Sequence, residues 1–131
     1  MIFMATLLTF SFCSCKENID LETGVTYSTY TLGEDGKKES FASFYMTSNK
    51  DTEGIWEYEI IGNDILEIVE SNEENKEIKD GTANYKTLIL KAKAPGEADI
   101  IFKLGSTEKC YSFVVGKAAN NFLDMQVFEV E

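Results

Sequence analysis

The feature that most constrains this chain is a succession of eight short segments rich in β-branched and aromatic residues, most of which alternate with polar residues. They read YSTYTL (27–32), SFASFYMT (40–47), IWEYEII (55–61), DILEIV (64–69), YKTLILKA (85–92), ADIIFKL (98–104), KCYSFVV (109–115) and DMQVFEV (124–130). In IWEYEII, Trp56 and Tyr58 fall on one face and Glu57 on the other, which is the period of a strand with one buried side. Because no segment has a convincing helical period, the pattern predicts an all-β fold, namely a β-sandwich of about seven to eight antiparallel strands.

Turn residues separate these segments. Pro95 and Gly96 suit the two central positions of a type II turn, so we expect them to join two strands into a hairpin. The polar stretch SNEENKEIKDGT (71–82) predicts a solvated loop that crosses between the two sheets.

The N-terminal residues have a different composition. Residues 1–12 (MIFMATLLTFSF) form an uncharged apolar run that is shorter than the roughly 20 residues of a membrane span and is typical of a secretory signal. The ending Phe12-Cys13-Ser14-Cys15 resembles a bacterial lipobox, which implies that Cys15 is acylated after export across the inner membrane. We therefore expect a signal peptide at 1–14, a lipidated N-terminus and spacer at 15–26, and a domain at 27–131 anchored in the cell envelope. The alternative is that the apolar run is a buried N-terminal strand.

Charge and missing residue types exclude several functions. The formal net charge is −11, and all 12 cationic side chains are lysines, so a nucleic acid would be repelled. The chain has no histidine, which removes the Ser-His-Asp triad and imidazole ligands for zinc. We expect no enzyme activity, no catalytic residue, no metal and no cofactor, and we expect a monomer.

Two individual residues have an expected structural role. Cleavage before Cys15 would leave Cys110 as the one unmodified cysteine, and its place in KCYSFVV predicts a packed thiol rather than a reactive one. We expect Trp56 to lie in the core, with stacking on a sugar as the alternative.

The segment 49–54 also contains a possible calcium loop. Asn49, Asp51 and Glu53 alternate before Gly54, as oxygen ligands do in the first half of such a loop. The twelfth position would be Ile60, where the EF-hand requires a carboxylate, so calcium is the weaker interpretation of this segment.

The stretch 49–115 resembles the chagasin family of inhibitors of papain-like cysteine proteases. The residues that carry the resemblance are GIWEYEIIGNDILEIVE (54–70), DGT (80–82) and YKTLILKAKAPGEADIIFKL (85–104), in the family's order and at about its spacing. The resemblance implies an immunoglobulin-like sandwich in which three loops at one end form a wedge that enters the protease cleft.

The resemblance also implies candidate binding residues. Asn49, Thr52 and Gly54 match the central Asn-Pro-Thr-Thr-Gly loop of the family, and DGT matches its glycine-rich second loop, at Asp80, Gly81 and Thr82. The third motif, Arg-Pro-aromatic, is missing, since residues 105–108 read GSTE. The resemblance implies a papain-like protease as the partner. The alternative is an immunoglobulin-like binding or structural module of a bacterial surface lipoprotein, with a protein or glycan partner.

Overall fold

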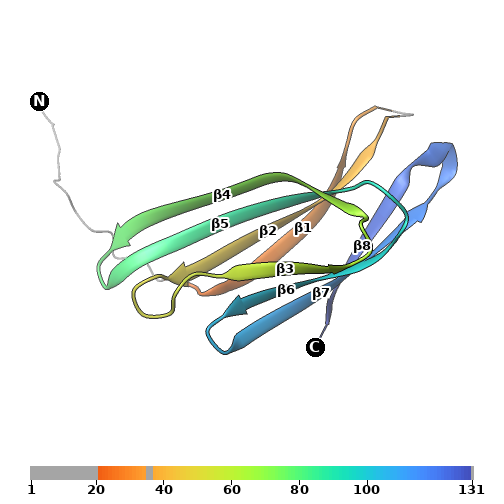
Figure 1. Cartoon of the computed structure of the whole chain (residues 1–131). Helices are drawn as coiled ribbons and strands as arrows, with labels where there is room; N and C mark the ends of the chain where they lie inside the picture. The colour runs from red at the N-terminus through yellow and green to blue at the C-terminus, as the bar shows by residue number, and fades with distance from the viewer. Residues whose placement is uncertain (1–20, 35–36, 131) are drawn as a thin grey trace, which may run out of the picture.

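The computed structural model describes residues 21–34 and 37–130, which form two packed antiparallel sheets of four strands each (Figure 1). The strands are β1 (Gly24–Leu32), β2 (Glu39–Asn49), β3 (Glu57–Gly62), β4 (Leu66–Ile78), β5 (Gly81–Ala92), β6 (Gly96–Leu104), β7 (Thr107–Lys117) and β8 (Leu123–Val130). A short 3-10 helix, η1 (Ala119–Asn121), precedes β8. Every segment predicted as a strand overlaps one of these eight, and the all-β sandwich is confirmed.

The order of the strands defines the topology. One sheet has the order β1-β2-β5-β4 and the other β3-β6-β7-β8. With the first seven strands lettered A to G, these are the ABED and CFG sheets of a constant-type immunoglobulin domain, with β8 added beside β7. The immunoglobulin-like architecture expected from the resemblance is therefore the one observed.

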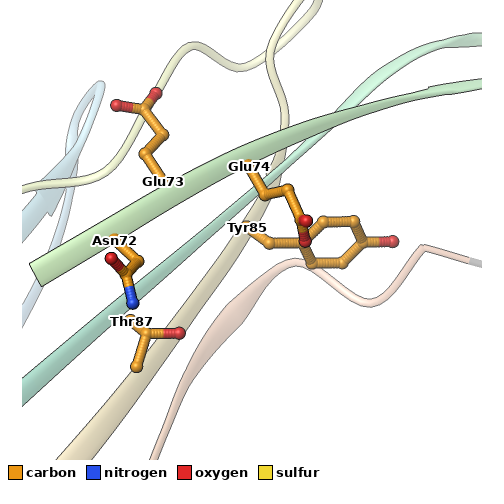
Figure 2. Close-up of a pocket in the computed structure, with 5 residues that line it drawn as sticks. All are labelled: Asn72, Glu73, Glu74, Tyr85 and Thr87. Atoms are coloured by element: carbon orange, nitrogen blue, oxygen red, sulfur yellow. The ribbon is translucent and has the colours of Figure 1, made fainter.

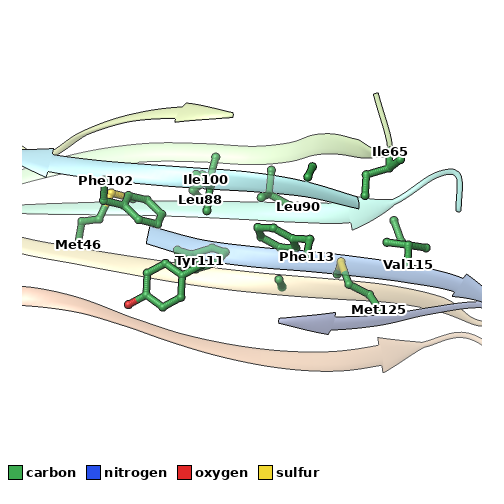
Figure 3. Packing of buried hydrophobic residues seen from close by; sticks show 14 of the residues in the cluster. Met46, Ile65, Leu88, Leu90, Ile100, Phe102, Tyr111, Phe113, Val115 and Met125 are labelled. Carbon is green, nitrogen blue, oxygen red and sulfur yellow. The ribbon is translucent and has the colours of Figure 1, made fainter. Parts of the chain in front are cut away.

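The core lies between the two sheets and is centred on aromatic side chains (Figure 3). The Phe44 ring lies 5.1 Å from that of Phe102 and 5.2 Å from that of Tyr111. Burial, together with the nearby Glu129 and Tyr27, raises the pKa of Tyr111 to about 12. Among the described residues, those of this cluster and those packed against it lie between Val25 and Val127.

The polar stretch 71–82 is not a loop, and this prediction was wrong. Most of it belongs to β4, which pairs with β5 as far as Ile78 and Gly81, and only Lys79 and Asp80 form the turn. The chain also stays in one sheet here instead of crossing to the other. The alternation is missing because β4 is an edge strand whose side chains from Glu67 to Glu77 are all exposed, so neither face requires apolar residues.

The hairpin predicted at Pro95 and Gly96 was also wrong. These residues lie at the start of β6, which is in the other sheet from β5, so they form a connection between sheets. Gly96 has a φ of +143°, as the sharp bend requires. The turn chemistry describes the local bend correctly, whereas the partner of each strand is decided by the packing of the core.

Trp56 is confirmed as a core residue, with 1% of its surface exposed and its indole nitrogen donating to Thr47 O at 2.9 Å. Cys110 lies in β7, as predicted.

Strand β1 begins at Gly24, inside the segment expected to be a spacer. The predicted signal peptide, the apolar run and the acylated Cys15 lie outside the described residues. No helix among residues 21–34 and 37–130 is long and apolar enough to cross a membrane.

Candidate functional site

Three connections that are far apart in the sequence meet at one end of the sandwich (Figure 1). Strands β2, β4 and β6 all run toward this end, so the β2–β3, β4–β5 and β6–β7 connections are placed side by side there. We call this surface the loop end, and it consists of residues 49–56, 79–82 and 105–106. It contains all six residues that the resemblance suggested for protease binding.

The β2–β3 connection is a single helical turn. The amide of Glu53 donates to Asn49 O at 2.8 Å, and the amide of Gly54 donates to Lys50 O at 3.2 Å. Gly54 ends this turn with a φ of +93°, a conformation that favours glycine. Thr52 lies at the exposed tip of the turn.

A buried serine and a half-buried lysine hold this connection from beneath. Ser48 Oγ donates to Gly54 O at 2.7 Å, and Lys86 Nζ donates to Trp56 O at 2.8 Å. The part of the connection that leads into β3 is therefore fixed to the inner face of the β1-β2-β5-β4 sheet.

A second set of hydrogen bonds joins this connection to the β4–β5 turn. Asn49 Nδ2 donates to Asp80 O at 3.2 Å, and the amide of Lys50 donates to Thr82 O at 2.7 Å. Thr82 Oγ1 donates to Asp51 Oδ2 at 3.2 Å. Two segments that sequence reasoning assigned to separate loops are thus bonded into one surface.

The Glu53 carboxylate connects this surface to the start of β1. Glu53 Oε1 accepts hydrogen bonds from Thr23 Oγ1 at 2.6 Å and from the Asn49 amide at 2.9 Å. These bonds, that from Thr23 first, hold the pKa of Glu53 below its usual value. Sequence reasoning missed Thr23, because nothing in the local pattern shows that residue 23 lies beside residue 53.

The β6–β7 connection contributes less to the surface. It is a two-residue turn of Gly105 and Ser106. Such a turn keeps the chain close to the sheet, so it does not project as far as the helical turn at 50–54.

The oxygen atoms suggested for calcium are used in other ways. Asn49 Oδ1 accepts from the Asp51 amide at 3.1 Å, and the Asp51 and Glu53 carboxylates accept from Thr82 and Thr23. Residues 21–34 and 37–130 contain no group of three or more acidic, cysteine or histidine side chains suited to a metal.

A hollow also lies along β4 and β5, outside the loop end (Figure 2). It is lined by Asn72, Glu73, Glu74, Tyr85 and Thr87. Figure 2 shows Glu73 pointing away from the other four side chains. Glu73 is held by the fully buried Asn84, whose Nδ2 donates to it and to Asn75 Oδ1, both at 2.8 Å.

Comparisons of the chain with protein-family models, with curated proteins and with solved structures find no match. The resemblance to the chagasin family therefore rests on the quoted motifs.

Proposed function

We propose that this protein inhibits papain-like cysteine proteases by inserting its loop end into the protease cleft. The observation that carries the proposal is the bonded surface formed by Asn49, Lys50, Asp80 and Thr82. A surface that is already ordered loses little conformational entropy on binding, so more of the contact energy contributes to affinity.

The chemistry of the cleft suits such a surface. A protease cleft accepts extended backbone, and the nucleophile attacks a peptide bond that lies across it. The compact helical turn at 50–54 fills the cleft without presenting an extended peptide bond to the nucleophile. The exposed Thr52 and Glu53 at its tip make the first contacts, and the acidic Glu53 favours a cleft with a basic rim.

The N-terminal resemblance adds a location to this proposal. Acylation of Cys15 would tether the sandwich to a membrane of the bacterial envelope through the residues between Cys15 and β1. The sandwich itself would remain outside the bilayer, since the lipid on Cys15 would be the group that inserts.

The second candidate is an immunoglobulin-like binding or structural module with a protein or glycan partner. Two observations favour it. The β4–β5 and β6–β7 connections are two-residue turns, so only one loop projects at the loop end. The hollow beside Tyr85 presents an aromatic ring with amide, carboxylate and hydroxyl groups, which are groups that bind the faces and hydroxyls of a sugar.

An inhibition assay tests the first candidate. A chain of residues 16–131, which contains all core residues that the structure describes, is titrated against a panel of papain-like enzymes. We expect inhibition, and we expect Thr52→Ala with Gly54→Ala to weaken it at least tenfold, because the first change removes a tip contact and the second strains a positive φ. The matched control, Thr31→Ala with Gly116→Ala, changes the same residue types outside the loop end and leaves inhibition unchanged.

Two outcomes decide between the candidates. Lack of inhibition across the panel at micromolar concentration contradicts the inhibitor proposal. Binding to a glycan array that is lost in Tyr85→Ala, in a chain that inhibits no protease, supports the second candidate instead.

A further inference from the structure

The four edge strands of the sandwich differ sharply in charge. Strands β1 and β4 are the edges of one sheet, and β3 and β8 are the edges of the other. Strand β4 (LEIVESNEENKEI) carries five glutamates and one lysine, β3 (EYEIIG) carries two glutamates, and β8 (LDMQVFEV) carries one aspartate and one glutamate. Strand β1 (GVTYSTYTL) carries no charge.

Charge on an edge strand prevents unwanted pairing with another copy. Like charges placed directly opposite each other destabilise a pair of strands, and an edge without charge, proline or a bulge is open to pairing. Self-pairing of β3, β4 or β8 would bring acidic side chains of two copies together, whereas self-pairing of β1 would not.

Strand β1 is also fixed in a regular extended conformation that suits pairing with another strand. It is in continuous register with β2 over all nine residues, from Gly24 opposite Thr47 to Leu32 opposite Glu39. Its aromatic rings are anchored on both faces of the sheet, since Tyr27 lies 5.1 Å from Tyr111 and Tyr30 stacks on Phe41 at 5.4 Å. Its other edge has no strand beside it among the described residues.

We propose that β1 pairs antiparallel with β1 of a second copy, so that two four-stranded sheets become one sheet of eight strands. A two-fold axis at Ser28, the middle residue of the strand, places Ser28 opposite Ser28 of the partner subunit. The same register places Thr26 opposite Tyr30 of the partner subunit and keeps the core-facing side chains of both copies on one face.

The proposed assembly is a closed dimer, and its affinity depends on the salt concentration. Each copy has one uncharged edge, so pairing stops at the dimer and does not continue into a fibre. Two copies of charge −11 repel each other, and salt screens this repulsion, so the dimer is stronger at higher ionic strength. The proposal replaces the expectation of a monomer and does not depend on the inhibitor function.

Sedimentation of residues 16–131 carrying Cys110→Ser tests the proposal. We expect a reversible dimer whose dissociation constant falls as sodium chloride is raised. Ser28→Lys places equal charges opposite each other at the axis, so it raises the dissociation constant at least tenfold. Ser71→Lys, at another exposed serine that lies on β4, leaves it unchanged. Thermal unfolding confirms that both variants are folded.

Cross-linking in the same background tests the register. Side chains directly opposite each other in an antiparallel pair have Cβ atoms about 4.5–5.5 Å apart, so Ser28→Cys forms a disulfide between copies under mild oxidation. The matched variant Ser71→Cys does not. A chain that stays monomeric at millimolar concentration and high salt overturns the proposal. Equal cross-linking of the two cysteine variants, or a dimer that Ser28→Lys leaves intact, overturns it as well.

Discussion

Asn49 and Gly81 are packed so closely that a Cβ added to Gly81 would stand 2.6 Å from Asn49 Oδ1. Gly81 has a φ of +144°, which side chains rarely adopt. The bonded loop end therefore depends on the absence of a side chain at residue 81, in the strand next to the one that carries Asn49.

The first prediction concerns this contact. Gly81→Ala should lower the free energy of unfolding by about 1–3 kcal/mol, because it adds both a clash and a strained φ. Adding Asn49→Ala should recover only part of the loss, since the clash is relieved and the strain remains. Urea denaturation measures both, and Gly116→Ala, where a Cβ meets nothing within 4 Å, is the control. Equal stability of Gly81→Ala and Gly116→Ala would contradict the prediction.

The second prediction concerns the pH dependence of the loop end. Because the pKa of Glu53 is lowered in the folded state, its stabilising bonds are present above the usual glutamate pKa and are lost as the pH falls through the lowered value. Thr23→Ala removes the largest cause and should return the pKa of Glu53 toward about 4.3. A carboxyl-detected NMR titration of both chains measures the change. An unchanged Glu53 pKa in Thr23→Ala would show that the bond is not formed in solution.

The third prediction concerns Cys110. Burial, with the nearby Asp99 and Glu108 carboxylates, raises the pKa of its thiol, and the thiolate is the reactive form. The rate of alkylation of Cys110 by iodoacetamide, plotted against pH, should therefore have its midpoint above about pH 8.5. Asp99→Asn should move the midpoint to lower pH, whereas Glu22→Gln, outside this strand pair, should not. A midpoint at or below that of a free thiol would contradict the prediction.

The fourth prediction concerns Asn84. This residue is fully buried, and its Oδ1 has no hydrogen-bond partner among the described residues, which is a cost to the folded state. Asn84→Leu removes that acceptor, while the exposed Glu73 and Asn75 regain water. The free energy of unfolding, measured by urea denaturation, should therefore stay within about 1 kcal/mol of that of the parent chain. A loss above about 2 kcal/mol would show that the bonds to Glu73 and Asn75 stabilise the fold.

The sequence predicts most of the fold because most strands have one buried face. Trp56 and the glutamate beside it show the alternation clearly, and the structure buries one and exposes the other. The part of β4 from Glu70 to Glu77 could not be predicted in this way, since an edge strand exposed on both faces has no apolar period. Its pairing with β5 is visible only once the sheet is assembled.

The candidate site was less accessible to sequence reasoning. The resemblance grouped Asn49 with Asp80 and Gly81, and the structure places them in contact. No sequence pattern indicates that the Asp51 carboxylate accepts a hydrogen bond from the Thr82 hydroxyl. The two residues are 31 positions apart and are brought together only by the register of β2 and β5. Non-local pairing of this kind is set by the whole core, not by neighbouring residues.

The hydrogen bond between Thr23 and Glu53 shows where the chain enters the sandwich. Thr23, just before β1, lies beside the loop end. From Cys15 to Thr23 there are eight residue steps, which reach at most about 27 Å. A protease domain of roughly 200 residues is about 40 Å across, judged from its radius of gyration. If Cys15 were acylated as proposed, the spacer would hold the loop end on the side of the sandwich that faces the bilayer. The length of that spacer would then set how large a protease could reach the loop end of a tethered copy.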